Sequence, residues 1–101
     1  MIKAKKSLGQ NFLKDESILN RIVEGANLTD EDMVVEIGPG MGVLTERLAE
    51  VCKKVVAIEL DDRLIDLLRN KLRNFENVEI IHGDVLRINL PELVKSEMLK
   101  V

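Results

Sequence analysis

The amino-acid sequence predicts an α/β fold with a parallel sheet, and two observations carry that prediction. Three short apolar runs, at residues 33–37, 55–60 and 78–82, are rich in β-branched side chains, as buried strands are. Between them, apolar residues recur three and four positions apart, which is the period of an amphipathic helix. Strands separated by helices of this length form βαβ units with right-handed crossovers.

The first half of the chain follows this scheme element by element. Asp15 can cap a first helix. The apolar residues that share one face of this helix are Ile18, Leu19, Ile22, Val23 and Ala26. A polar loop at 27–32 leads into the strand at 33–37, which ends at Gly38. A second helix follows, with Leu44, Leu48 and Val51 facing inward.

The second half repeats the pattern. After the strand at 55–60, Asp61 or Asp62 can cap a third helix. Its apolar side consists of Leu64, Ile65, Leu68 and Leu72. Asn89 before Pro91 predicts a short helix, because proline suits the first helical position. Residues 98–101 are expected to begin a fourth strand, so the fold is expected to be truncated after about three to four strands.

Composition limits the function classes. A chain of 101 residues is long enough for one domain, and its 46% apolar and 33% charged residues are typical of a globular protein. No apolar run is long enough to span a membrane, and the first residues lack the apolar stretch of a secretory signal, so a cytoplasmic protein is expected. Cys52 and His82 are the only cysteine and histidine, which argues against a disulfide or a zinc site.

The charge is distributed unevenly. Residues 1–14 carry four lysines and no acid, whereas the remainder has a formal charge of −7. The sequence therefore divides into a basic N-terminal arm, residues 1–14, and a domain over residues 15–101. A basic arm on an acidic body predicts that only the arm faces a polyanion. A solvated terminus is the alternative, and charge alone favours it.

A glycine-rich loop follows the strand at 33–37. Gly38, Gly40 and Gly42 alternate there, with Glu36 two residues ahead of the first. Missing side chains let a backbone turn tightly and approach a ligand. A nicotinamide-dinucleotide fingerprint would require a glycine at position 43 or 45, which are Val43 and Thr45, so an oxidoreductase is disfavoured. A purely structural turn remains the alternative.

Two further carboxylates stand at strand ends. Glu59 lies 21 residues after Gly38, where a carboxylate can accept hydrogen bonds from ribose hydroxyls. Asp84 ends the third apolar run and can accept from an adenine amino group. The alternatives are a helix cap for Glu59 and an Asx-turn for Asp84. In parallel sheets, ligands bind at the carboxyl ends of the strands, so the three strand ends together predict a nucleoside site.

The segment Ser7–Leu13 (S-L-G-Q-N-F-L), followed by Val35–Gly40 and Leu44-Thr45, resembles the ribosomal RNA adenine dimethyltransferase family, of the small-subunit type. The resemblance implies a Rossmann-like, S-adenosylmethionine-dependent methyltransferase fold. It implies S-adenosyl-L-methionine as cofactor, and small-subunit rRNA or a pre-ribosomal particle as partner. The cofactor-binding residues that it and the loop indicate are Asn11, Leu13, Glu36, Gly38, Gly40, Gly42, Glu59, Leu60, Asp84 and Val85. Lys3, Lys5 and Lys6 are expected to contact RNA.

The family's catalytic motif is Asn-Leu-Pro followed by Tyr or Phe. This chain contains Asn89-Leu90-Pro91, but Glu92 follows, and we interpret the run as a helix start. No catalytic residue is therefore assigned within the chain. We expect the chain to be the cofactor-binding part of a dimethyltransferase, and we expect this part to be inactive by itself. The alternative is a non-catalytic RNA-binding or ribosome-assembly module with a vestigial cofactor fold.

The family's strand order also predicts an oligomeric state. The strand at 33–37 normally lies beside the fourth strand, of which only 98–101 would be present. An apolar strand with an unpaired edge is a template for pairing. Self-association is therefore expected, most simply as a dimer.

Overall fold

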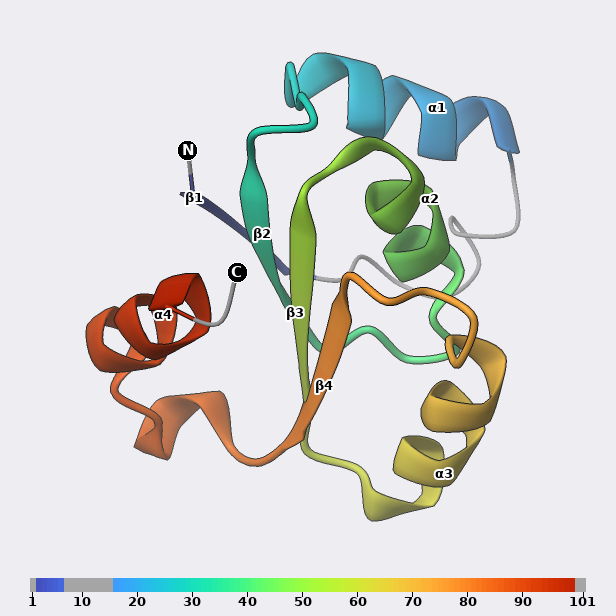
Figure 1. Cartoon of the computed structure of the whole chain (residues 1–101). Coiled ribbons are helices and arrows are strands. Elements are labelled where there is room, and N and C mark those ends of the chain that lie inside the picture. Colours follow the sequence, from blue (N-terminus) through green and yellow to red (C-terminus); the bar gives the residue numbers. More distant parts are fainter. Residues whose placement is uncertain (1, 7–15, 100–101) are drawn as a thin grey trace.

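The first element of the computed structural model is a strand, β1 (Ile2–Lys6), and the structure describes residues 2–6 and 16–99. The helix α1 (Glu16–Gly25) follows, and then β2 (Met33–Ile37), α2 (Val43–Val51) and β3 (Lys54–Glu59). The chain continues with α3 (Asp62–Lys71), β4 (Val78–His82), a single 3₁₀ turn at Val85–Arg87 and α4 (Leu90–Leu99). Figure 1 shows these elements in chain order.

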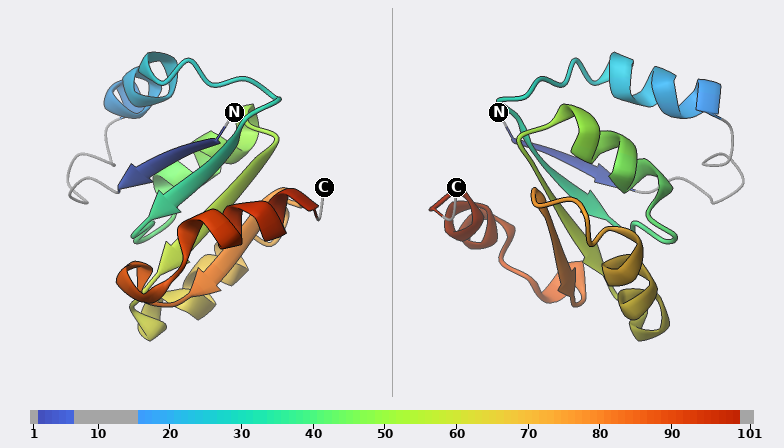
Figure 2. Two further views of the ribbon diagram at one scale, coloured as in Figure 1. Left: turned by 90° about the vertical axis from the view of Figure 1, so that its left-hand side faces the viewer. Right: turned by 45° about the vertical axis from the view of Figure 1, so that its right-hand side comes forward.

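All strands are parallel and lie in the order β1-β2-β3-β4. Each strand is added beside the preceding one, and right-handed crossovers then place the connecting helices on one face of the sheet. Figures 1 and 2 show this arrangement, with α1, α2 and α3 on one side and α4 alone on the other.

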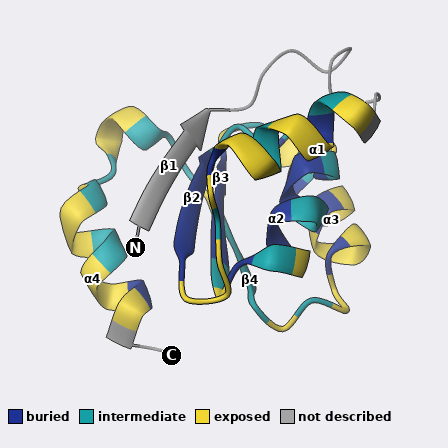
Figure 3. Cartoon of the chain, turned by 90° about the horizontal axis from the view of Figure 1, so that it is seen from above, coloured by how far each residue is buried: buried dark blue, intermediate teal, exposed yellow. Residues whose placement is uncertain are grey.

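The alternation of side chains along β2 and β3 divides the core between these two faces. On the first face, Val34 and Val55 pack against apolar residues of α1 and α2. This cluster also contains Leu19, Leu44, Leu48, Ala49 and Cys52. On the second face, Met33, Val35, Val56 and Ile58 pack against Leu90, Leu93 and Val94 of α4. Figure 3 shows that the buried residues concentrate in β2, β3 and α2.

The predicted strands and helices are largely confirmed. The strands at 33–37 and 78–82 have the expected bounds, and the helix caps predicted at Asp61 and Asn89 are formed. The middle strand is Lys54–Glu59 rather than 55–60, so Leu60 lies just beyond it. The helix predicted at Asn89 is longer than expected, because α4 runs for ten residues to Leu99.

That length makes one prediction wrong. Met98 and Leu99 belong to α4 and do not begin a fourth strand, while residues 100 and 101 lie outside the described residues. Lys54 explains why the helix continues, since its Nζ lies 3.1 Å from Glu97 Oε1 and donates to the Glu97 carbonyl at 3.3 Å. This ion pair fixes the last turn of α4 to the start of β3.

The strand β1 is the second departure from the sequence analysis. Residues 2–6 of the basic arm pair with β2, with Ile2 opposite Met33 and Lys6 opposite Ile37. The edge of β2 is therefore paired, and the physical reason given for a dimer at that edge is removed. Among the described residues, no helix is long and apolar enough to cross a membrane, and no group of three potential ligands could hold a metal ion.

Candidate cofactor site

The candidate site lies where β2, β3 and β4 end. Because the three strands are parallel and paired in register, their carboxyl ends meet at one edge of the sheet, with Ile37 opposite Ile58 and Glu59 opposite His82. The glycine loop, Glu59 and the turn at Gly83–Asp84 are thereby brought together. The sequence prediction that these three strand ends are neighbours is confirmed by this register.

The glycine loop adopts a backbone that requires glycine. Gly38, Gly40 and Gly42 all have positive φ, of 69°, 60° and 82°. Gly42 is the N-cap of α2, and a Cβ there would lie 2.9 Å from Leu68 Cδ2. The loop therefore turns from β2 into α2 so close to α3 that there is no room for a side chain at Gly42.

Glu59 connects the glycine loop to the loop after β3. Its Oε1 accepts from the Gly40 N–H at 3.1 Å and its Oε2 accepts from the Asp61 N–H at 2.9 Å. The side chain does not cap α3, because Asp61 does so by accepting from the Arg63 N–H at 2.9 Å. A carboxylate has about four acceptor positions, so Glu59 retains acceptor capacity beyond these two hydrogen bonds.

Glu36 is a buried carboxyl behind the loop. It is 0% exposed, the Thr45 hydroxyl donates to its Oε1, and its Oε2 has no hydrogen-bond partner. Desolvation by burial raises the pKa of Glu36 to about 7, against the lowering effect of the Thr45 hydrogen bond, and the negative charge of Glu59 raises it further. The carboxyl is therefore shared between proton-bound and ionised forms near neutral pH.

Thr45 was not predicted as part of the site. Its sequence signals are its place in the Leu44-Thr45 pair of the family resemblance and its position in the first turn of α2, three residues after Gly42, where a side chain can point back towards β2. It is fully buried, and its hydroxyl is the one donor that Glu36 has among the described residues.

The turn after β4 is more open. Asp84 Oδ1 accepts from the Leu86 N–H at 2.9 Å, so the Asx-turn that was the alternative interpretation is formed. Asp84 Oδ2 lies 3.9 Å from Arg87 Nε, and Val85 is half-buried. Leu60 is 65% exposed beside this turn, and its carbonyl lies 3.2 Å from His82 Nε2. An exposed leucine at a strand end is available for apolar contact with a ligand.

The remaining predicted residues divide into two groups. Asn11 and Leu13 lie outside the described residues. Lys3, Lys5 and Lys6 belong to β1, of which the backbone alone is described. Asn89 does not belong to the site at the strand ends. Its Oδ1 accepts from the Glu92 N–H at 3.2 Å, so its side chain caps α4. The interpretation of Asn89-Leu90-Pro91 as a helix start is confirmed.

The site fits an adenosyl cofactor in the chemistry of its groups. A glycine loop with room for close backbone approach, an orphaned buried acceptor at Glu36 Oε2, and acceptors at Glu59 and Asp84 are what a cationic nucleoside ligand needs.

Known proteins are similar to this chain in sequence and in structure. A family model described as ribosomal RNA adenine dimethylase matches residues 1–100. The ribosomal RNA small subunit methyltransferase A of Leuconostoc mesenteroides is 47% identical over 96 residues, which are 95% of this chain and 32% of the relative. That of Ligilactobacillus salivarius is 53% identical over 90 residues, covering 89% of this chain and 30% of the relative. The chain thus spans about a third of these relatives' length.

Solved structures agree with the sequence relatives. The 23S rRNA methyltransferase ErmE matches with a TM-score of 0.72 and 41% identity, over 77% of this chain and 32% of that one. A dimethyladenosine transferase from Plasmodium falciparum matches with a TM-score of 0.68 and 33% identity, over 73% and 28%. The predicted Rossmann-like methyltransferase fold is confirmed by these neighbours. The chain belongs to the ribosomal RNA adenine dimethylase family.

Proposed function

We propose that this chain is the S-adenosyl-L-methionine-binding part of an enzyme that dimethylates adenine amino groups in small-subunit rRNA. The observation that carries the proposal is the meeting of the glycine loop, Glu59 and Asp84 at one edge of the sheet, in a chain whose family match runs over residues 1–100. The cofactor would supply an electrophilic methyl group, and the residues of this chain would bind and orient it.

Each group has a proposed task. Gly38 and Gly40 give the methionine portion access to the backbone, and Glu36 provides a buried acceptor beneath the loop. Glu59 accepts from the ribose hydroxyls with the capacity that Gly40 and Asp61 leave, and Asp84 accepts from the adenine amino group. Leu60 and Val85 flank the adenine ring, while Asn11 and Leu13 belong to the segment that folds over the cofactor.

Calorimetric titration with S-adenosyl-L-methionine tests the ribose assignment. Glu59→Ala is expected to weaken binding roughly tenfold or more, because a hydrogen-bonded charged acceptor contributes on the order of 1.5–3 kcal/mol. Glu50 is an exposed glutamate on α2, so Glu50→Ala is the matched control and should bind the cofactor with the affinity of the unsubstituted chain. Equal affinity for Glu59→Ala and the parent would contradict the assignment.

Because Glu59 also holds the glycine loop, a folding defect has to be separated from a lost contact. Glu59→Gln keeps the size of the side chain but only one acceptor oxygen for the Gly40 and Asp61 N–H groups, so its thermal midpoint should fall less than that of Glu59→Ala, while its affinity falls to a similar extent. If affinity fell only in step with the thermal midpoint across the two variants, Glu59 would stabilise the loop without contacting the ligand.

Cofactor binding separates the two functional alternatives, because neither of them predicts methyl transfer by this chain alone. The chain by itself is expected to leave small-subunit RNA unlabelled when incubated with methyl-labelled cofactor, because the one Asn-Leu-Pro run it contains caps α4. A non-catalytic assembly module would bind RNA without binding the cofactor. Reproducible labelling would overturn the expectation of inactivity.

RNA contact is proposed for Lys3, Lys5 and Lys6, which are point charges without neighbouring aromatic residues. Such lysines contact phosphate, so their contribution should depend on salt and not on base sequence. In the full-length enzyme to which we propose this chain belongs, replacing all three lysines by alanine is expected to flatten the salt dependence of RNA affinity. An unchanged slope would return the segment to a purely structural role in β1.

A further inference from the structure

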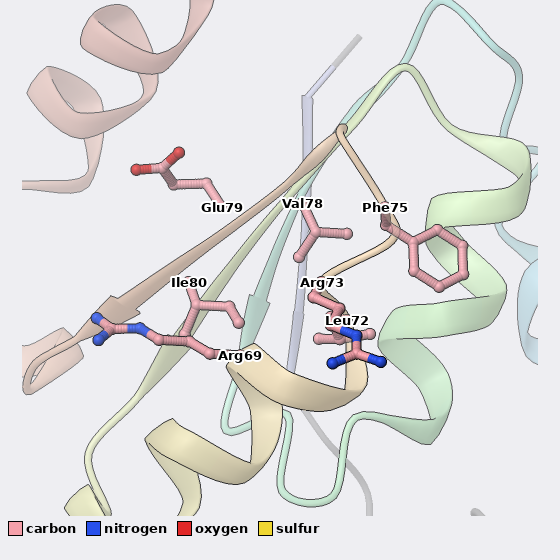
Figure 4. Close-up of a pocket in the computed structure, with 7 residues that line it drawn as sticks. All are labelled: Arg69, Leu72, Arg73, Phe75, Val78, Glu79 and Ile80. Atoms are coloured by element: carbon pink, nitrogen blue, oxygen red, sulfur yellow. The ribbon is translucent and has the colours of Figure 1, made fainter.

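The outer edge of β4 carries a groove that the proposed function does not use. Its volume is about 270 Å³, and we call it the edge groove. Figure 4 shows its lining, which comes from the C-terminal part of α3, the turn after it and β4. The lining residues are Arg69, Leu72, Arg73, Phe75, Val78, Glu79 and Ile80.

The backbone of β4 along this groove is unpaired on one side, since β4 is the last strand of the described sheet. The Asn77 carbonyl accepts from the Val55 N–H, and the Gly83 N–H donates to the Glu59 carbonyl. Because a parallel strand turns alternate residues to the same neighbour, the odd-numbered residues of β4 face β3. The N–H and C=O groups of Val78, Ile80 and His82 therefore point outward, away from the sheet.

Two arginines stand over this open backbone. Arg69 in α3 and Arg73 in the turn after it are both exposed, and neither forms an ion pair among the described residues. Arg73 donates only to the Asn70 side chain, at 3.4 Å. Lys71, which lies between them in the sequence, is engaged elsewhere, 3.2 Å from Glu46 Oε1. The lining also contains one carboxylate, Glu79, but Figure 4 shows its side chain turned away from the two arginines. The edge groove thus carries a net positive charge on its α3 side, beside unused backbone donors and acceptors.

The groove is poorly suited to a nucleobase. Single-stranded RNA is held by stacking on aromatic rings, and Phe75 is the one aromatic residue in the lining. Its ring packs against the core cluster of α1 and α2, and Figure 4 shows it turned away from the arginines. The apolar side chains of Val78 and Ile80 suit alternate side chains of an added strand better than they suit a sugar-phosphate chain.

The groove is also poorly suited to a second copy of this chain. Two β4 edges that paired antiparallel in one continuous sheet would place both α3 helices on the same side. Arg69 and Arg73 of one copy would then face the same arginines of the other, and like charges at a sheet edge oppose pairing. The charge therefore selects for a partner of opposite sign.

From these contacts we propose that the edge groove docks an extended acidic segment of a partner protein, which adds to the sheet as a strand beside β4. Its backbone pairs with the outward groups of Val78, Ile80 and His82. Its acidic side chains on the α3 side meet Arg69 and Arg73. This interaction surface is separate from the strand ends at which the cofactor is proposed to bind, and it does not depend on that proposal.

Titration of the 101-residue chain with short peptides, followed by amide NMR, tests this. The probe is a capped peptide of about seven residues, a typical strand length, that alternates valine with glutamate. Its amide shifts should concentrate at Val78, Ile80 and His82. A peptide with lysine in place of glutamate tests the charge, and one with N-methylated backbone at alternate positions tests the strand pairing. The lysine peptide should bind about tenfold more weakly, and the N-methylated peptide should fail to bind.

The double variant Arg69→Glu, Arg73→Glu should weaken binding of the acidic peptide by about tenfold. This is the effect expected when two exposed attractive charge pairs are replaced by repulsive ones. Arg21→Glu, an exposed arginine on α1, is the matched control and should leave the affinity unchanged. Circular dichroism of each variant checks the fold, which these exposed positions should not alter.

Three outcomes would overturn the proposal. One is acidic-peptide binding that Arg69→Glu, Arg73→Glu does not weaken. Another is binding of the N-methylated peptide with unchanged affinity, which would exclude strand addition. The third is a single-stranded RNA of similar length that shifts the same amides while the acidic peptide does not, which would make the groove a nucleic-acid site.

Discussion

The two faces of the sheet are built differently. On the face covered by α1, α2 and α3, residues such as Val34, Leu48 and Val55 are 0% exposed. On the other face, α4 contributes the partly buried Leu93 and Val94, and its last turn is held by the ion pair between Lys54 and Glu97. The strand residues are buried on both faces, since Val56 is also 0% exposed, but three helices cover the first face, which we call the packed face, whereas α4 alone covers the second and its last turn is held by that charge pair.

This difference extends to the candidate site. The glycine loop, Glu36 and Thr45 belong to the packed face, where α2 and α3 determine their positions. Asp84 and Val85 lie on the segment that leads to α4, and their environment is more exposed. We therefore expect the glycine-loop end of the site to be rigid before any ligand arrives, and the end at Asp84 and Val85 to be ordered by the ligand.

The largest expected effect tests the packed face directly. Leu48→Ala should lower the free energy of unfolding by about 2–5 kcal/mol, because it leaves a cavity at a fully buried position. Leu93→Ala on α4 should cost about 1 kcal/mol, since that side chain is only partly buried. Urea denaturation measures both. Equal losses would mean that the two faces are equally packed.

The next effect concerns the ionisation of Glu36. Its folded pKa is about 7 against 4.5 for an ordinary glutamate, so the folded state binds more protons between these values and stability falls as the pH rises through that window. The loss is of the order of 3 kcal/mol at most. Below the lower value and above the upper one, this group contributes no pH dependence.

Replacing Glu36 by glutamine should remove this pH dependence. At about pH 8 the variant is expected to be more stable than the parent, whereas near pH 4 the two should differ little. Thr45→Val, which removes the hydroxyl donor that lowers the pKa, should extend the parent's pH dependence to higher pH. Parallel pH profiles of the parent and Glu36→Gln would show that another group titrates.

A smaller effect is expected at the loop itself. Gly42→Ala should destabilise by about 1–2 kcal/mol, because its φ of 82° disfavours a Cβ, which would also press on Leu68. Gly25→Ala is the control, since nothing lies within 4 Å of a Cβ there, and it should be neutral or slightly stabilising. A neutral Gly42→Ala would show that α3 gives way, and that the packed face is looser than its burial indicates.

Local pattern predicted much of this fold. Residues such as Val34 and Val56 predict buried strands, because both faces of a parallel sheet need apolar side chains. Gly42 predicts a turn, because few other residues adopt its φ. The helix cap at Asp61 was likewise predictable from its position before an amphipathic run. Each of these signals lies within a few neighbouring residues, so it can be recognised in the sequence without knowledge of the tertiary structure.

The rest depends on tertiary contacts that no local pattern encodes. The strand β1 is a lysine-rich segment whose pairing depends on the free edge of β2, a partner about thirty residues away by the register of Ile2 with Met33. Likewise, α4 extends to Leu99 because Glu97 meets Lys54, 43 residues earlier. At the site, the sequence indicated Glu59 but not that Gly40 and Asp61 already donate to it.

The smallest predicted effect lies on the face covered by α4. Asn89 Oδ1 accepts from the Glu92 N–H and so satisfies one of the unpaired donors in the first turn of α4. Asn89→Ala removes that acceptor and should cost about 1 kcal/mol, whereas Asn89→Asp keeps an N-cap acceptor and should cost little. Because α4 packs through partly buried residues, the loss should appear as faster amide exchange within α4, with unchanged exchange in α2. Exchange that accelerates equally in both helices would show that α4 unfolds only together with the core, and that the two faces form one cooperative unit.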